Sequence, residues 1–384
     1  MNQSTTTSAH DRSIAAQSAW LLLGCCLGLL AVGVMTAASV APPGEFASKM
    51  KSHGASVAVA MLGFLVALKT PISLWRRAAP WILGAVLVAL AVVLVPGVGQ
   101  KVKGGRRWLE LLGQRFQPSE FAKVALILFL ADFIGKAPER LTDLWRGYCC
   151  AAGVVLLTAG AVFFEPDLGT TLYLVAIGGV MLAVGTAPTM YLIGSGVVAI
   201  PLVLGLGYLR YDHAKTRSTN DYQVVQSLRA LGEGGPFGVG YGAGRMKLGH
   251  VPEGHNDFIL AAVGEEWGLI GTTVVLLLFA GIVVAGARAV SAVRDPFARL
   301  IVFAVPFAIV FQAAVNLFVV TGLVYPKGIA LPFVSSGGSC LLAFSVAVGL
   351  AANVLREQAQ RSADERSTFA SLLSASSDPQ ASPA

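Results

Sequence analysis

Long apolar runs, separated by short polar or charged stretches, dominate the chain from residue 18 onward. Ten of them approach the roughly 20 residues that a helix needs to cross a bilayer. They lie at 18–40, 54–68, 80–97, 120–135, 148–164, 168–186, 188–208, 267–287, 299–321 and 338–355. A spanning segment must satisfy its backbone polar groups internally, so runs of this length indicate helices. The pattern therefore predicts an all-α integral membrane protein with about ten transmembrane helices.

The first run, 18–40, has two interpretations. Residues 37–41 resemble a small-residue cleavage site, which would make the run a signal peptide. The run is long for the apolar core of a signal peptide, however, and its only preceding Lys or Arg is Arg12. We therefore expect a retained transmembrane helix.

Polar segments frame a single membrane domain, 17–356. Residues 1–16 are polar and 357–384 are rich in Ser and Ala, which predicts disordered tails. Inside the domain, the stretch 209–266 is long and polar, and we expect one large extracytoplasmic loop there. An even number of spans places both termini on the same side of the membrane.

Composition supports this class and excludes others. Hydrophobic residues make up 55% of the 384 residues and charged residues only 13%, whereas soluble domains carry about 25% charge. The net charge of +7 would suggest nucleic acid as a partner of a soluble protein, but here it fits basic loops beside anionic lipid. The five cysteines lie in apolar stretches and predict neither a metal site nor a disulfide framework.

The Lys and Arg residues give an orientation and an anomaly. Of 28 in total, 13 lie on the side of the termini and 14 on the other side, with Lys123 inside a span. Without the segments 98–118 and 209–266 the count becomes 13 against 3, which predicts cytoplasmic termini. Long loops escape this rule, but 98–118 is short. An anionic ligand bound on the outer face would explain the excess of Lys and Arg in these two segments.

The first basic segment carries groups suited to phosphate. Two glycines, which let the backbone approach a ligand closely, precede an arginine pair that includes Arg107, and then Trp108. Pro118 is typical of the first turn of a helix. Lys123 would then lie one turn inside the membrane, where a lysine costs roughly 2.5 to 3.5 kcal/mol and needs a partner. Glu120 is a candidate, in either a structural ion pair or a substrate-binding one.

Further polar positions lie between or within the runs. Asp167 occupies a tight turn, where it either caps the next helix near Thr170 or pairs with Lys123. Gln312 and Asn316 share a helix face and predict a polar interior or an interhelical hydrogen bond.

Two glycine-rich stretches predict irregular backbone. Residues 325–339 contain two prolines and three glycines, which predicts a non-helical segment that lines a cavity or is buried in protein. Residues 232–244 lack the G-K-[ST] ending of a nucleotide loop and follow no strand, so we expect a flexible loop over a substrate groove.

The densest cluster of ionisable residues comes just before the run at 267–287 and contains Glu253, His255, Asp257, Glu265 and Glu266. Such a cluster at the edge of a membrane points to function. We predict that Asp257 does the chemistry. His255 either orients a substrate or is a structural histidine at the interface, and the last two glutamates either act in the site or start the next helix.

These blocks together resemble the SEDS family of polytopic proteins, which includes the FtsW, RodA and SpoVE groups. The matching blocks follow the family's order across almost the whole membrane region: 105–108, 117–123, 166–170, 222–228, 234–244, 252–268 and 326–339. Lys247 and Pro326 to Gly328 resemble the FtsW pattern more than the RodA pattern. Asn256 and Ser336 depart from the family's usual Thr and Tyr, which weakens the assignment to a subgroup but leaves the aspartate in place.

The resemblance implies a fold of ten transmembrane helices in the bacterial inner membrane and a peptidoglycan glycosyltransferase that polymerises lipid II. The FtsW-type pattern implies action at the division septum, beside a class B penicillin-binding protein and divisome proteins. The family's proposed catalytic aspartate falls on Asp257. The candidate substrate-binding residues are Arg107, Trp108, Glu120, Lys123, Asp167, Lys247, His255 and Ser335.

Glycan elongation needs a base for the acceptor hydroxyl and charges that stabilise the departing undecaprenyl pyrophosphate. We expect Asp257 to be the base, with inversion at the anomeric carbon, and Arg107, Lys123 and Lys247 to face the pyrophosphate. A divalent cation, Mg²⁺ or Mn²⁺, could share that role, and we expect no organic cofactor. The alternatives are a lipid II flippase, a RodA-type elongation polymerase and a non-catalytic scaffold.

Overall fold

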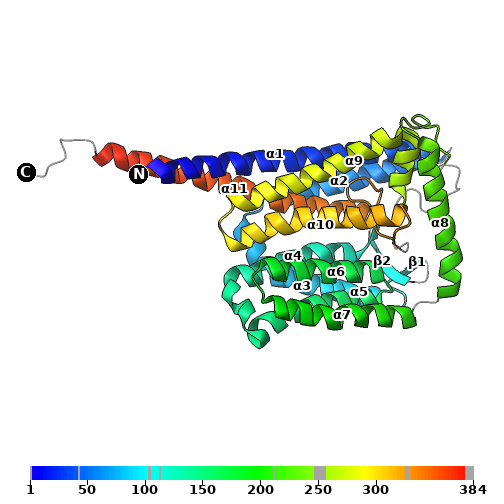
Figure 1. Cartoon of the computed structure of the whole chain (residues 1–384), viewed down its shortest axis with the longest axis horizontal. Helices are drawn as coiled ribbons and strands as arrows, with labels where there is room; N and C mark the ends of the chain where they lie inside the picture. Colours follow the sequence, from blue (N-terminus) through cyan, green and yellow to red (C-terminus); the bar gives the residue numbers. More distant parts are fainter. Residues whose placement is uncertain are drawn as a thin grey trace, which may run out of the picture.

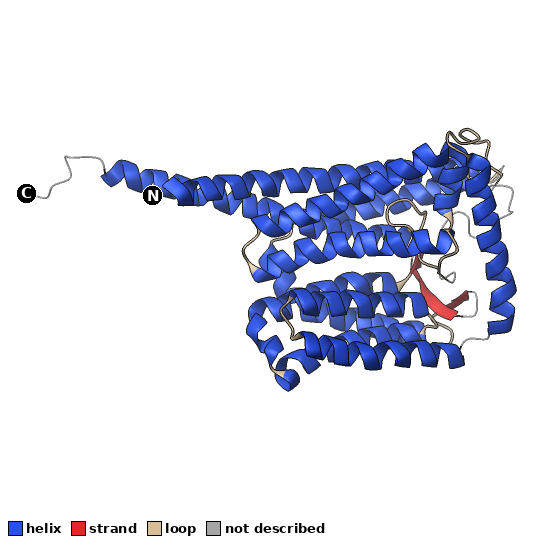
Figure 2. Ribbon diagram, viewed as in Figure 1, coloured by secondary structure: helices blue, strands red, loops and turns tan. Residues whose placement is uncertain are grey.

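A computed structural model describes the chain except for residues 1, 42–43, 103–104, 112–113, 211–212, 246–256, 325–327 and 377–384. The described residues form an elongated bundle of helices with a small β-sheet at one end (Figures 1 and 2). Both termini lie at the opposite end of the bundle. We call these the sheet end and the terminal end.

Each predicted apolar run overlaps one helix, as the all-α membrane fold requires. The ten helices are α1 (Asn2–Ser39), α2 (Phe46–Lys69), α3 (Ile72–Val93), α4 (Pro118–Lys136), α5 (Cys149–Phe164), α6 (Leu168–Val184), α7 (Thr189–Arg210), α9 (Ile259–Ala292), α10 (Pro296–Val320) and α11 (Gly338–Ser376). Among the described residues, 7 helical stretches are long and apolar enough to cross a membrane by length and composition. The apolar parts of α6 and α7 are shorter, and α4 carries charged residues. Helix also extends into both segments for which the sequence predicts disorder, 2–16 and 357–376.

The stretch 209–266 is not the single large loop that its polarity predicts. Helix α8 (His213–Gly234) lies across the sheet end (Figure 1), and α9 begins at Ile259 rather than near 267. Hydropathy misses α8 because a helix that spans no membrane needs no apolar run. Glu265 and Glu266 therefore lie inside α9 and do not start it.

A break in α9 holds the glycine-rich segment in place. Gly268 has φ of 67° inside the helix, a left-handed conformation that only glycine adopts without strain. Such a break leaves preceding carbonyls without helical partners, and Val239 N and Gly240 N donate to the carbonyls of Glu265 and Glu266 at 2.9 and 3.1 Å. The segment around Gly240 is thus docked on α9 by backbone hydrogen bonds.

The short basic segment between α3 and α4 folds into a three-stranded antiparallel sheet, which the sequence did not predict. Its strands are β1 (Gln100–Val102), β2 (Gly105–Leu111) and β3 (Gln114–Phe116), in the order β1-β2-β3. The sheet brings the basic residues of this segment to one end of the bundle (Figure 2).

Helix α4 lies at the centre of the bundle, against α3, α6, α10 and α11. Most of its residues are buried, on every side of the helix, as expected for a helix enclosed by others. Its charged side chains must therefore find partners within the protein.

Residues 328–337, between α10 and α11, form the predicted non-helical segment, here called the re-entrant segment. Its core is buried in protein: Leu331, Phe333 and Val334 are all buried. Gly33 of α1 packs directly on it, because a Cβ at this position would lie 2.6 Å from the carbonyl oxygens of Phe333 and Val334. Helix α1 can thus approach this backbone closely only with glycine.

We predict that Gly33→Ala lowers the melting temperature of the purified protein. The added methyl group overlaps two backbone carbonyls, and overpacking of this kind typically costs about 1–3 kcal/mol. Gly24→Ala on the same helix is the matched control, since a Cβ there meets nothing within 4 Å. It should leave the melting temperature unchanged or raise it slightly. Equal melting temperatures for the two variants would contradict the close packing.

Candidate active site

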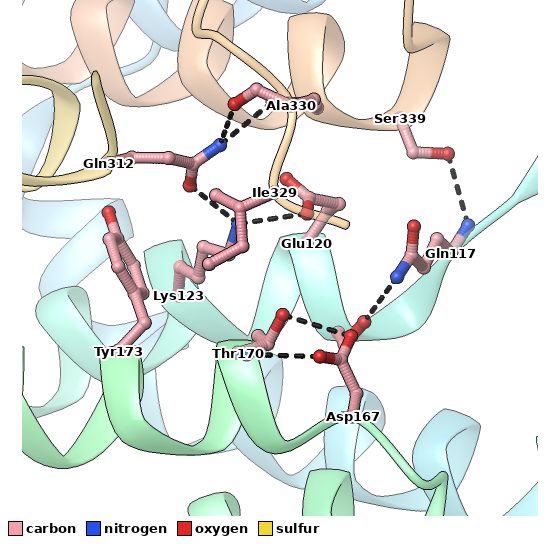
Figure 3. Close-up of polar contacts among 12 residues, drawn as sticks. Gln117, Glu120, Lys123, Asp167, Thr170, Tyr173, Gln312, Ile329, Ala330 and Ser339 are labelled. Atoms are coloured by element: carbon pink, nitrogen blue, oxygen red, sulfur yellow. Dashed lines mark hydrogen bonds and ion pairs between the residues drawn. The ribbon is translucent and has the colours of Figure 1, made fainter. Parts of the chain in front are cut away.

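Lys123 is a buried cation on α4, and it contacts residues of α6, α10 and α11. Figure 3 shows it between Glu120, Gln312 and Tyr173. Its Nζ donates to Glu120 Oε1 at 2.8 Å and to Gln312 Oε1 of α10 at 2.7 Å. The same atom lies 4.9 and 5.7 Å from the ring centroids of Tyr173 on α6 and Phe344 on α11. The predicted pairing of Lys123 with Glu120 is confirmed. With 2% of its surface exposed, Lys123 is neutralised by these partners and closed to solvent.

Arg107 ties β2 to the turn between α5 and α6. Its Nε donates to the carbonyl of Glu165 at 3.0 Å, Nη2 donates to the carbonyl of Pro166, and Nη1 lies 3.8 Å from Asp167 Oδ2. All three guanidinium nitrogens are thus directed at one turn, so Arg107 connects the sheet to the turn between α5 and α6.

Asp167 caps α6, the first of its two interpretations. Its Oδ1 accepts from Thr170 N and its Oδ2 accepts from Thr170 Oγ1, both at 3.0 Å (Figure 3). The charge of the carboxylate is shared with Arg107. Asp167 therefore stabilises the turn that Arg107 grips.

Glu165 is a buried carboxyl in the same turn that sequence reasoning missed. It is 0% exposed, and within the described structure neither carboxyl oxygen has a hydrogen-bond partner. Burial most of all, and then the charge of Asp167, raise its pKa, while Arg107 lowers it, and the net result is a pKa of about 9. A carboxyl directly after an apolar run is the signal that could have found it.

Asp257 lies half-buried just before α9 and against the re-entrant segment. A Cβ on Gly328 would lie 3.0 Å from Asp257 Oδ2, so this carboxylate rests beside a glycine backbone. Asn316 Nδ2 of α10 donates to the carbonyls of Asp257 at 2.7 Å and Ile329 at 2.8 Å. The predicted polar face of α10 is therefore real.

Gln312, one helical turn from Asn316, completes this face. Its Nε2 donates to the carbonyl of Ala330 at 2.8 Å while its Oε1 accepts from Lys123. Asp257 and Lys123 are thus connected through α10. Asn316 and Gln312 both donate to the re-entrant segment. Asn316 also donates to Asp257, and Gln312 also accepts from Lys123.

Other candidate residues have supporting positions. Ser335 is buried in the re-entrant segment, where its Oγ accepts from Leu331 N at 2.8 Å. Trp108 is half-buried in β2. Gln117 N donates to Ser339 Oγ at 3.0 Å, which connects the end of the sheet to α11 (Figure 3).

The remaining members of the ionisable cluster divide into two groups. Glu265 Oε1 accepts from Arg245 N at 2.6 Å, and Glu266 accepts a hydrogen bond from Ser39 at the end of α1. Both glutamates therefore hold neighbouring backbone and helix ends. Glu253, His255 and the cation Lys247 lie outside the described residues.

The described residues do not gather a metal site. No three His, Cys, Asp or Glu side chains among them lie close enough to hold an ion. A divalent cation therefore stays a prediction.

Comparison with known proteins gives consistent matches. A family model of FtsW, RodA and SpoVE proteins, described as a cell cycle protein, matches residues 16–360. A probable peptidoglycan glycosyltransferase FtsW of Trichlorobacter lovleyi is 40% identical over 306 residues, which is 77% of this chain and 80% of the relative.

Two solved structures share the fold. A peptidoglycan synthase complex, described as coordinating polymerization and crosslinking, contains a chain that matches with a TM-score of 0.74 at 26% identity, covering 88% of this chain and 98% of that one. The rod shape determining protein RodA of Thermus thermophilus matches with a TM-score of 0.66 at 28% identity, covering 88% and 97%.

We predict that Glu165 makes stability fall as pH rises. The folded chain keeps this proton up to about pH 9, whereas an unfolded chain releases it near 4.5. The stability linked to this proton is fully present below the unfolded pKa and is lost as pH rises through the folded one. Thermal unfolding in detergent should therefore show that the stability of Glu165→Gln, relative to that of wild type, increases as the pH rises between these two values.

The exposed carboxyl of Glu139 supplies the control variant, Glu139→Gln. A constant difference between wild type and Glu165→Gln at every pH would show that Glu165 does not hold a proton in the folded chain.

Proposed function

We infer that this chain, which belongs to the FtsW, RodA and SpoVE family of cell cycle proteins, is a membrane-embedded peptidoglycan glycosyltransferase. The family model matches most of the chain, and a relative with that activity in its name is 40% identical over 306 residues. Since this relative is an FtsW protein, the septum of dividing cells is the site of action that it supports. Elongation, as in the RodA group, is the alternative role.

We propose lipid II as the substrate and the sheet end as the extracytoplasmic face. Apart from the segments 98–118 and 209–266, the basic residues are distributed 13 to 3 in favour of the terminal end, which supports cytoplasmic termini. Both exceptional segments reach the sheet end (Figure 1). A concentration of positive charge there suits a substrate that carries a pyrophosphate.

The observation that carries the mechanism is the carboxylate of Asp257, held at the sheet end beside the Gly328 backbone. We propose that this carboxylate takes the proton from the acceptor sugar hydroxyl. The hydroxyl oxygen then bonds to the anomeric carbon of the donor as the bond from that carbon to pyrophosphate breaks. The new bond forms on the face opposite the leaving group, so the configuration at that carbon inverts.

Lys123 and Arg107 act through the protein rather than on the substrate. Lys123 is enclosed by protein and paired with Glu120, so it holds helices together beneath the site and makes no direct contact with the substrate. Arg107 holds the turn before α6 and positions the sheet. Direct contacts with the pyrophosphate then fall to other cations, such as the exposed Arg115 of β3. Lys247, outside the described residues, stays a candidate. Charges of this kind stabilise a developing anion strongly where water is excluded.

We propose a class B penicillin-binding protein as the partner that crosslinks the glycan. The similar chain in the solved peptidoglycan synthase complex supports an assembly of this kind, because that complex couples polymerization to crosslinking.

We predict that Asp257→Ala abolishes polymer formation by the purified protein. Wild type and variant are incubated in detergent with lipid II, with Mg²⁺ or Mn²⁺ or with a chelator, and the glycan product is separated on a gel. Loss of the base should lower the rate by at least about 10²-fold. Glu139→Ala changes an exposed carboxylate at the terminal end and should polymerise at the wild-type rate.

Full polymerisation by Asp257→Ala would end the assignment of the base. If wild type instead moves fluorescent lipid II across liposome membranes and makes no polymer, the chain is a flippase. An unchanged rate in the chelator would dismiss the divalent cation.

A further inference from the structure

Asn316 is an amide that the membrane domain retains in its interior. Its side chain is 0% exposed. A buried amide must form hydrogen bonds with protein groups, because it has lost its hydrogen bonds with water. Both bonds of its Nδ2 go to backbone carbonyls, those of Asp257 and Ile329. An amide nitrogen has two hydrogens, so the donor capacity of Asn316 is fully used at this one place.

One of the two carbonyls is that of Asp257 itself. The other belongs to Ile329 and follows Gly328, where a Cβ would lie 3.0 Å from Asp257 Oδ2. The Asn316 side chain therefore connects the main chain of the aspartate to the backbone beside its carboxylate. Gln312, one turn earlier, binds the next carbonyl, that of Ala330, so the re-entrant segment cannot shift along α10 without breaking both contacts.

A general base must come within about 2.6–3.2 Å of the proton that it removes. A displacement of about 1 Å can cost on the order of 10²-fold in rate. Asp257 lies just before α9 and is half-buried, so the direction of its carboxylate depends on where its main chain is fixed.

We propose that Asn316 is a positioning residue for glycosyl transfer, whose amide fixes the Asp257 main chain against the re-entrant segment. This inference rests on the proposed function, in which the Asp257 carboxylate takes the proton. Asn316 itself touches no substrate and acts through Asp257.

The chain provides a closely matched control in Asn353 of α11. Asn353 is also 0% exposed, and its Nδ2 also donates to two backbone carbonyls, those of Ala67 at 3.0 Å and Thr70 at 2.6 Å. These contacts lie at the terminal end of α2, far from the proposed site. Each amide donates two hydrogen bonds to backbone carbonyls, and Asn353 Oδ1 also accepts one from Arg356 Nη2 at 3.3 Å. Loss of Asn353 therefore removes at least as many hydrogen bonds as loss of Asn316.

The experiment compares Asn316→Ala with Asn353→Ala in the full chain. Three quantities are measured: the melting temperature, kcat and KM for lipid II polymerisation, and hydrogen exchange of the backbone amides at 257–261. Both variants should lose a similar amount of thermal stability. Asn316→Ala should lower kcat by on the order of 10²-fold with little change in KM, and should speed exchange at 257–261. Asn353→Ala should keep kcat within about twofold of wild type and leave that exchange unchanged.

Wild-type kcat in Asn316→Ala, an equal loss of kcat in Asn353→Ala, or unchanged exchange at 257–261 would each overturn the proposal. Asn316→Asp keeps the size of the side chain and covers the case in which the alanine variant does not fold. If Asn316→Asp also fails to fold while Asn353→Asp folds, Asn316 is structural and the proposal is wrong. If wild type makes no polymer, the proposed function fails, and hydrogen exchange still decides whether Asn316 holds Asp257 in place.

Discussion

The burial of Lys123 is the constraint on which the centre of this structure depends. A lysine inside a membrane domain must be compensated, and here the compensation comes from Glu120 on the same helix and from Gln312, Tyr173 and Phe344 on three others. Removal of one member of a buried ion pair typically costs about 3–5 kcal/mol, because the other charge is left alone. α4, α6, α10 and α11 are therefore required to meet at one point.

That meeting point is also connected to Asp257, the proposed base. The amide that accepts from Lys123 donates to the re-entrant segment, and the next polar residue on α10 holds both that segment and Asp257. A second connection runs from the sheet through Arg107 to the Asp167 turn and so to α6. These contacts connect the charged and polar groups at the sheet end to the apolar bundle, and such support is what a glycosyltransferase site requires.

Local patterns in the sequence predict most of the helices and the contacts between residues close in sequence. They do not predict most contacts between residues far apart in sequence. The ten apolar runs predict ten helices because the bilayer fixes their length and polarity. The pair of Glu120 with Lys123 and the cap of Asp167 on Thr170 follow from spacings of three residues. Helix α8 was missed because it is polar, and the start of α9 was missed because Glu265 and Glu266 interrupt its apolar residues.

The partners of Arg107 could not be predicted because they lie 58 and more residues away along the chain. The same holds for Asn316, whose helix face the sequence identifies but whose contact with Asp257 depends on tertiary packing. The only signal for Glu165 in the sequence is its position directly after an apolar run, and its complete burial is seen only in the structure.

The most direct test of the account is an experimental structure of the Asp257→Asn variant with lipid II bound. The account predicts that a sugar hydroxyl lies within about 3.2 Å of the side chain at position 257, with the pyrophosphate against the basic surface of the sheet end. A disaccharide bound elsewhere on the bundle, or a pyrophosphate at the terminal end, would contradict it.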